Sequence, residues 1–471
     1  MLTSLRLDQQ RTACRSDVHR GGEVSGFDGS VYRPYDDGYE AARCGAVWNA
    51  IKPNRFPAVI VVAGTQDDVP RAVNLAREEG LQIGIRSGGH SWVGNAVREG
   101  GLLLDLSGLK KIEIDVAARV ATVEPGVRVA ELERALAAEG LYFPFGHCPT
   151  VGVTGFVLGG GYGFNSQNVG PGALSLRAID VVTAAGDSVH ATDEVHSDIM
   201  WAARGSGPGF FAVATRLHLD LRPLPAVVAA SAQIHPLAAF DDLVAWYLEN
   251  DCPGLFVASS NPLIPQDDTV LMISAYTFAD DINQAKEHLA ILETAPGLDR
   301  ALLHQSAQPT SPAQLYGIFD LMYPEGRRYL SDNMWIENAS STDLWREAKQ
   351  IIDTLPAAGS SVWLIPGTSM GPNKDDRDAA FSMQSTFSFQ IYAAYNDSAQ
   401  DQAMLAWHND AINRIDPYSL GAGYVGDSNL FLHPVAVLHP DNAARLEQLR
   451  RKYDPTGRFF SYPAELPPAR V

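Results

Sequence analysis

The sequence predicts an α+β protein of two domains, and three observations support this fold class. A chain of 471 residues is long enough for two or three domains. Up to residue 225, short apolar strands alternate with amphipathic helices, whereas longer strands separated by helices follow Pro223 and Pro225. We therefore expect an N-terminal arm at 1–27, a first domain at 28–225, a second domain at 226–430, and a C-terminal segment at 431–471 that returns to the first domain.

The first domain is predicted to begin with a right-handed βαβ unit. AVIVVA at 58–63 is an apolar run typical of a buried strand. Thr65 is a candidate N-cap, and Asp68, apolar positions at helical spacing and a closing Gly80 follow it. LQIGIR at 81–86 then forms the second strand. The elements expected after it are strands at 101–109, 118–127 and 210–225, helices at 127–140 and 198–205, and a two-stranded hairpin at 175–192.

The second domain is predicted to be an antiparallel sheet with helices on one face. Its strand candidates are 269–278 and 387–397, and its amphipathic helices are 239–250, 281–294 and 342–355. A last helix begins near residue 441 and should stop at Asp454-Pro455, because proline cannot continue a helix.

Composition and charge exclude several classes of protein. Lysine plus arginine number 36 and aspartate plus glutamate 55, which gives a formal charge of −19 and argues against binding nucleic acid or an anionic membrane. The four cysteines show no zinc spacing and are too few for a disulfide scaffold. No stretch is long and apolar enough to span a membrane, and the N-terminus lacks the apolar core of a signal peptide, so we expect a cytoplasmic protein.

Two glycine-rich segments are the most informative part of the sequence. The first, RSGGHSWVG at 86–94, follows a predicted strand. Adjacent glycines allow a tight turn, and the free backbone N–H groups of such a turn form a nest for an anion such as a diphosphate. The pattern is not GxGxxG, and taken alone it fits an ordinary tight turn with an incidental histidine equally well.

The second segment, at 146–163, contains six glycines in the twelve residues from Gly152 to Gly163. Such density is costly in backbone entropy, which suggests a backbone that lies against a planar or anionic group. Taken alone, the glycine run could be a mobile loop and Cys148 a small buried hydrophobic residue.

Together, in this order, the two segments resemble the vanillyl-alcohol oxidase superfamily of FAD enzymes, and more narrowly its berberine-bridge-enzyme-like branch. The resemblance is strongest over about residues 50–225. It implies a two-domain PCMH-type FAD-binding fold, in which 28–225 binds FAD and 226–430 is an antiparallel-sheet substrate domain covered by helices. It also implies bicovalent FAD, with the flavin C8-methyl bonded to His90 and the flavin C6 to Cys148.

The resemblance further assigns residues around this cofactor. Those expected at the diphosphate are Ser87, Gly88, Gly89 and Ser91. Those expected along the flavin and its ribityl chain are Val151, Thr154, Gly155, Gly159, Gly160 and Gly163. Val213 is expected to border the adenine, and Arg86 could be a surface ion-pair partner. No metal is assigned, because His147 has no second ligand at metal spacing.

The catalytic base cannot be copied from the family. Where relatives often carry YxNY, this chain has Tyr424-Val-Gly-Asp427, so the second tyrosine is replaced by an aspartate. The candidates are Tyr424 first, Asp427 second and then Tyr392 on the predicted strand 387–397. Each is equally explained as an ordinary sheet aromatic or a solvated acid, and a phenol of reference pKa near 10 needs help to act near pH 7.

The expected function is that of an oxidase, which transfers hydride from an alcohol, hemiacetal or amine carbon of a sugar or natural product to flavin and reduces dioxygen to hydrogen peroxide. Val151 favours this hypothesis, because in the family a small valine three residues after the attachment cysteine leaves room for dioxygen. The alternatives are a flavin dehydrogenase with another acceptor, and a non-oxidising flavoprotein that binds or cyclises a natural product. Trp335, Trp363, Tyr323 and Tyr329 are candidates for an apolar substrate platform, and core packing explains them as well.

Overall fold

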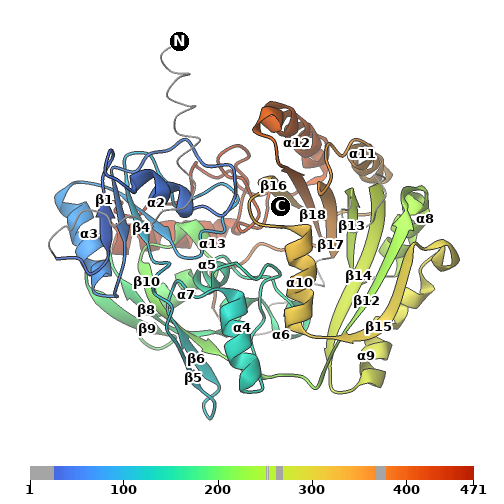
Figure 1. Cartoon of the computed structure of the whole chain (residues 1–471), viewed down its shortest axis with the longest axis horizontal. Coiled ribbons are helices and arrows are strands. Elements are labelled where there is room, and N and C mark those ends of the chain that lie inside the picture. The colour runs from blue at the N-terminus through green and yellow to red at the C-terminus, as the bar shows by residue number, and fades with distance from the viewer. Residues whose placement is uncertain (1–25, 251, 253, 261–268, 367–377, 471) are drawn as a thin grey trace.

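The computed structural model describes residues 26–250, 252, 254–260, 269–366 and 378–470. Apart from its last two residues, the expected N-terminal arm lies outside this part of the chain. The α+β class is confirmed: the first part of the chain combines small sheets with short helices, and the second part is a seven-stranded sheet with helices (Figure 1).

Three sheets form the first part of the chain. The first has the order β1-β2-β4-β3, and its members are β1 (Ser30–Tyr32), β2 (Val59–Val62), β3 (Ile83–Arg86) and β4 (Leu102–Asp105). The second is antiparallel, with the order β5-β6-β10-β8-β9, and contains β5 (Ile112–Asp115), β6 (Val120–Val123), β8 (Leu176–Val182), β9 (Ser188–Thr192) and β10 (Val213–Asp220). The third pairs β7 (Leu141–Tyr142) with β11 (Arg222–Pro223).

Short helices cover these sheets. They are α2 (Tyr39–Gly45), α3 (Asp68–Glu78), α4 (Val129–Ala138), α5 (Val153–Leu158), α6 (Ser166–Val169) and α7 (Ser197–Ala203). The βαβ unit is confirmed as β2, α3 and β3, but the predicted N-cap is wrong. The N-cap is Asp67 and the helix begins at Asp68, two residues later than an N-cap at Thr65 would place it. The Asp68 carboxylate accepts the backbone N–H groups of Asp28 and Gly29 at 2.9 Å, while the Thr65 hydroxyl bonds to the Asp28 carboxylate.

The second part is one antiparallel sheet of order β15-β12-β14-β13-β17-β18-β16. Its strands are β12 (Val227–Pro236), β13 (Leu255–Ser260), β14 (Thr269–Ala279), β15 (Leu303–Thr310), β16 (Arg328–Ile336), β17 (Ser361–Pro366) and β18 (Phe387–Tyr395). Its helices are α8 (Phe240–Glu249), α9 (Ile282–Leu289), α10 (Pro312–Met322), α11 (Thr342–Asp353) and α12 (Asp401–Ile415). In Figure 1, α8, α9, α11 and α12 lie on the outer face, and α10 lies between the sheet and the first part.

Alternation along β18 gives this sheet two different faces. Phe387, Phe389 and Ile391 belong to the core under the outer helices, whereas Tyr392 and Ala394 pack in the core shared with the first part of the chain. Because successive strand side chains point to opposite faces, the sheet can bury its helices on one side and present side chains toward the first part on the other.

The C-terminal helix α13 (Pro440–Tyr453) ends where the Asp454-Pro455 pair predicts. Beyond it, the Ile83 N–H donates to the Arg458 carbonyl at 2.7 Å and the Phe460 N–H donates to the Ile83 carbonyl at 3.0 Å. The end of the chain is therefore hydrogen-bonded along β3, directly before the first glycine loop.

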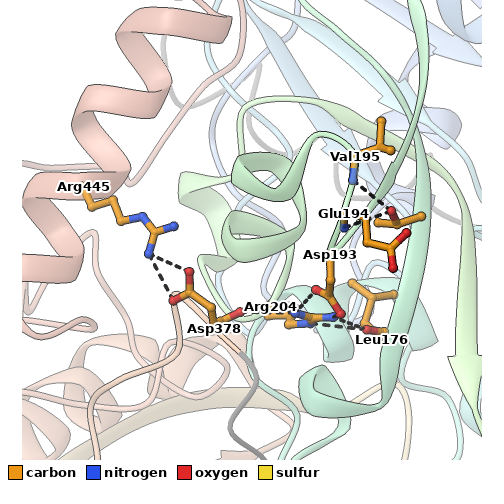
Figure 2. Close-up of polar contacts among 8 residues, drawn as sticks. Leu176, Asp193, Glu194, Val195, Arg204, Asp378 and Arg445 are labelled. Carbon is orange, nitrogen blue, oxygen red and sulfur yellow. Dashed lines mark hydrogen bonds and ion pairs between the residues drawn. The ribbon is translucent and has the colours of Figure 1, made fainter.

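A buried arginine holds the segment that follows residue 377 against the first part of the chain (Figure 2). Arg204 is only 1% exposed, and its guanidinium donates to the Asp193 carboxylate and to the carbonyls of Leu176 and Asp378. The Asp378 carboxylate in turn pairs with Arg445 of α13 at 2.9 Å. A hydrogen bond from the Phe381 N–H to the Arg204 carbonyl continues this attachment.

Among the described residues, no helix is both long and apolar enough to cross a membrane. The cytoplasmic location stays a prediction.

Candidate functional site

A cavity of about 420 Å³ lies where the two glycine segments, the inner face of the seven-stranded sheet and the C-terminal segment meet. Most of the predicted site residues line it: Ser87, Gly88, Gly89, His90, Ser91, Cys148, Val151, Thr154, Gly155, Gly159, Gly163, Tyr392, Tyr424 and Asp427. A cavity of this size with mixed polar and apolar walls is suited to a cofactor and a small molecule.

The two glycine segments cross each other in contact. A Cβ atom added to Gly88 would lie 2.5 Å from the Gly152 nitrogen, and one added to Gly152 would lie 2.7 Å from the Gly88 nitrogen. Gly89 has a φ of +73°, which a residue with a side chain rarely adopts. Glycine is therefore required at these positions for the backbones to line the cavity together.

Arg86 is not the surface residue that the sequence suggested. It is 9% exposed, and its Nη1 donates to the Asp105 carboxylate at 2.7 Å across the parallel pair of β3 and β4. This ion pair fixes the end of β3, from which the first glycine loop departs.

His90 is held as a neutral imidazole. Burial lowers the pKa of His90 to about 4. Its Nε2 lies 3.0 Å from the Thr150 hydroxyl, and its ring stacks on Trp48 at a centroid distance of 4.4 Å. A neutral, oriented imidazole keeps a ring nitrogen lone pair for bond formation.

Cys148 also opens onto the cavity, but as a thiol. Burial raises its pKa to about 12, and the negative charges of Asp427 and Asp320 add to this effect. The thiolate, the reactive form, is therefore scarce unless a neighbouring group takes the proton.

Asp427 is the ionisable group best suited to proton transfer near neutral pH. Burial raises its pKa to about 6, although the Trp92 indole N–H donates to its Oδ1 at 2.9 Å and lowers the pKa. The negative charge of Asp332 contributes to the increase. A carboxyl group that titrates near pH 6 can accept a proton at pH 7 and release it again.

The two tyrosine candidates titrate far above neutral pH. Burial raises the pKa of both phenols above their usual value. The Tyr424 oxygen accepts the Gly161 N–H at 3.3 Å, and the Tyr392 hydroxyl donates to Gln390 at 2.6 Å. These contacts fix both rings at the cavity wall, where both phenols stay protonated near neutral pH.

Four predicted residues do not line the cavity: Val213, Gly160, Trp335 and Tyr329, of which Tyr329 stacks on Trp48 at a centroid distance of 5.2 Å and donates its hydroxyl to the Pro324 carbonyl. Val213 is fully buried in the core between β10 and the first sheet, because strand alternation places its neighbours Ala212 and Ala214 toward the cavity instead. Gly160 has a φ of +107°, and an added Cβ would lie 2.7 Å from the Phe381 ring, so it is in contact with the segment held by Arg204. Trp335 is fully buried against the segment around Ala422.

Several residues of the site were missed in the sequence. Trp92 lies in the first glycine segment, at 86–94, but Asp427, which accepts its indole hydrogen bond, is 335 positions away in the chain. His147 Nε2 lies 2.9 Å from the Tyr276 hydroxyl, and Phe319 and Gln390 also line the cavity. Neighbouring strands bring Trp363 opposite Gln390, a pairing that no short-range pattern indicates.

The residues present fit FAD. The Thr154 hydroxyl and the Arg86 Nε are buried without a hydrogen-bond partner among the described residues, and both residues line the cavity. An added polar group could satisfy them. The crossed glycine loops offer backbone to a diphosphate and a planar ring, and an imidazole and a thiol, the two side chains expected to attach the flavin, open onto the same space.

Comparisons with known proteins agree with this geometry. Residues 57–192 match the family model described as "FAD binding domain". The FAD-linked oxidoreductase janO of Penicillium janthinellum is 31% identical, over 89% of this chain and 94% of its own. The (R)-6-hydroxynicotine oxidase of Paenarthrobacter nicotinovorans is 28% identical, over 92% and 95%.

Solved structures share the whole fold. The 6-hydroxy-D-nicotine oxidase from Arthrobacter nicotinovorans superposes with a TM-score of 0.81 at 22% identity, covering 93% of this chain and 99% of that one. Berberine bridge enzyme superposes with a TM-score of 0.78 at 19% identity, covering 94% and 98%.

Proposed function

Because this chain belongs to the family of FAD-linked oxidoreductases and has the PCMH-type fold of berberine bridge enzyme, we propose that it is an oxidase with bicovalently bound FAD. The proposed substrate is a small molecule with an oxidisable alcohol, hemiacetal or amine carbon, and the proposed electron acceptor is dioxygen, which leaves as hydrogen peroxide. The observation that carries the proposal is a single cavity lined by His90, Cys148 and a carboxyl group of pKa about 6.

FAD, when bound, supplies the hydride acceptor and passes the two electrons to dioxygen. His90 and Cys148 are the residues proposed to hold it covalently. The bond to His90 needs no prior deprotonation, because its imidazole is already neutral at pH 7. The bond to Cys148 requires loss of the thiol proton, and the nearby Asp427 carboxylate is the proposed acceptor for it.

Asp427 is also the proposed base for the substrate. Loss of hydride from carbon leaves a proton on the substrate oxygen or nitrogen, and a group within hydrogen-bond reach must take it. The indole N–H of Trp92 orients the Asp427 carboxylate. Tyr424, held by Asn333 on both its N–H and its carbonyl, is proposed to position the substrate rather than to take the proton.

The cavity wall favours an aromatic or largely apolar substrate over a free sugar. Tyr323, Trp363 and Tyr392 meet at ring-centroid distances of 5.4–5.9 Å on the sheet side, and Phe319 continues this surface toward His147. Aromatic surfaces of this kind bind planar apolar groups through buried area and ring stacking.

The alternatives differ in how their flavin is reduced and reoxidised. The flavin of a dehydrogenase would be reduced by substrate but reoxidised slowly by air. The flavin of a non-oxidising protein would not be reduced by substrate at all. Val151 lines the cavity and carries a short side chain, which supports access for dioxygen.

The test is anaerobic mixing of the purified protein with a panel of aromatic alcohols, cyclic amines and sugars, followed by admission of air. We expect bleaching of the flavin absorbance by a member of the first two classes, and one hydrogen peroxide per turnover in air. Asp427→Asn should slow the bleaching about 100-fold or more, the scale of a lost general base, and Tyr424→Phe should slow it less. A larger effect of Tyr424→Phe would reverse the two roles.

A further inference from the structure

The solvent-facing side of the five-stranded sheet carries a cluster of two histidines and one aspartate that the proposed chemistry does not use. Asp180 lies on β8, which pairs with β10 on one side and with the edge strand β9 on the other; His190 lies on β9 and His218 on β10. His190 Nδ1 is 2.5 Å from one carboxylate oxygen of Asp180, and His218 Nε2 is 3.3 Å from the other. None of the three lines the cavity that holds His90 and Cys148.

These residues form a suitable ligand set for a transition metal ion. One ligand atom from each residue can be chosen so that all three lie within 4.8 Å of one another. Two imidazole nitrogens and one carboxylate oxygen are donors that Zn²⁺ binds at about 2.0–2.2 Å, and a water molecule can complete four-coordination. Tetrahedral bonds of that length separate the ligand atoms by about 3.3–3.6 Å, close to the distance already present between Asp180 and His218.

The sheet fixes these ligands without a metal. Asp180 is the direct register partner of His190, and His218 is the direct register partner of Thr122 on β6. The Thr122 hydroxyl lies 3.0 Å from the Nδ1 of His218 and so directs the opposite nitrogen, Nε2, toward Asp180. A hydrogen bond to the second ring nitrogen is the usual way in which a metal-binding histidine is oriented.

For the three side chains to coordinate one metal ion, only the His190 ring has to move appreciably. Its side chain is 56% exposed and is free to rotate away from the short contact with Asp180. Asp115 lines the surface hollow that His190 and His218 also line, and it adds negative charge there. Glu113 and Arg177 line the hollow too, but each is paired, Glu113 with Lys111 and Arg177 with Asp220 at 2.6 Å. The net charge of −19 further favours a cation over an anion here.

We propose that Asp180, His190 and His218 bind one divalent transition metal ion, for which Zn²⁺ is the probe, at a site separate from the catalytic cavity. The ion links three adjacent strands, so its binding stabilises the five-stranded sheet and leaves the flavin chemistry unchanged. Asp180 is 10 positions from His190 and 38 from His218 in the chain, and the pairing of β8, β9 and β10 brings the three side chains together, so no short metal-ligand motif marks them in the sequence.

The test is calorimetric titration of the flavin-loaded full chain with Zn²⁺, and with Ca²⁺ in parallel. We expect one Zn²⁺ per chain, no comparable Ca²⁺ binding, and an increase in the thermal midpoint with Zn²⁺. His190→Ala and His218→Ala should each weaken binding more than about tenfold, and Thr122→Val should weaken it by about 10-fold through loss of orientation. Turnover in the absence of added metal should not change.

His304→Ala is the matched control. His304 lies 2.9 Å from the Glu293 carboxylate in an exposed pair, and no cluster of three candidate ligand atoms among the described residues includes it, so its removal should leave Zn²⁺ binding intact. An X-ray absorption spectrum of zinc in the unmutated protein should show two imidazole ligands, a readout that depends on no variant. Absence of Zn²⁺ binding, equal binding of Ca²⁺, a spectrum without imidazole, or equal loss of binding in His304→Ala would each overturn the proposal.

Discussion

Replacing Trp92 by phenylalanine tests whether Asp427 is the base and whether its pKa is set by one hydrogen bond. The indole N–H of Trp92 donates to the Asp427 carboxylate at 2.9 Å and favours the ionised form, while burial favours the protonated form. Phenylalanine keeps most of the ring that packs against Tyr323 and Tyr392 but removes the donor. We therefore expect the pKa of Asp427 to increase from its present value of about 6.

The size of the increase follows from the hydrogen bond. A hydrogen bond to a charged group contributes about 1.5–3 kcal/mol, and one pKa unit corresponds to about 1.4 kcal/mol. Loss of the bond should therefore raise the pKa by about 1–2 units. Since only the ionised carboxylate accepts a proton, flavin reduction at pH 6 should slow about 5- to 50-fold, and the variant and parent rates should converge near pH 9.

The assay is anaerobic stopped-flow reduction of the flavin from pH 5 to 9, with a substrate that has no titrating group in this range. The parent should gain rate through a midpoint near pH 6, and Trp92→Phe through a midpoint near 7–8. Trp48→Phe is the control, because the Trp48 indole N–H has no hydrogen-bond partner in the described part of the chain, so the midpoint should stay near 6. An unchanged midpoint in Trp92→Phe, or a pH dependence that persists in Asp427→Asn, would refute the assignment.

Three further predictions concern cofactor attachment, dioxygen and stability. His90→Ala and Cys148→Ala should each leave flavin bound in acid-denatured protein, and only the double variant should release it; release of all flavin from the parent would exclude covalent attachment. Val151→Leu should slow reoxidation of the reduced flavin by air at least about tenfold, an increase of about 1.4 kcal/mol in the barrier, with little effect on flavin reduction by substrate. Equal reoxidation rates in the variant and the parent would show that Val151 does not control the access of dioxygen. Arg204→Met should lower the free energy of unfolding by about 2–3 kcal/mol in urea denaturation, because the carbonyls of Leu176 and Asp378 lose a charged donor; a change below 0.5 kcal/mol would mean that this contact does not hold the segment.

Local sequence determined the fold class and the elements that line the cofactor side. The strand at 58–63, the helix ending near Gly80 and the glycine segments each have their signal within a few residues, since strand burial, helix periodicity and backbone freedom are local properties. That His90 and Cys148 share one cavity was implied by the resemblance of the two glycine segments to the berberine-bridge-enzyme-like branch, and both residues line the cavity. The exact start of α3 did not follow from local sequence, because the carboxylate of Asp68 binds the distant backbone of Asp28 and Gly29 instead of a local cap.

Tertiary structure decided the electrostatics and the substrate side. Asp427 becomes the proposed base because burial raises its pKa to about 6, against the lowering effect of the hydrogen bond from Trp92, whereas burial raises the pKa of Tyr424 and Tyr392 further away from neutral pH. The aromatic wall formed by Tyr323, Trp363 and Tyr392 depends on which face of β17 and β18 meets the first part of the chain. The cluster of Asp180, His190 and His218 depends on β8 lying between β9 and β10 in the sheet. Contacts between residues hundreds of positions apart depend on strand order and packing, which no short segment contains, so only the folded chain could supply them.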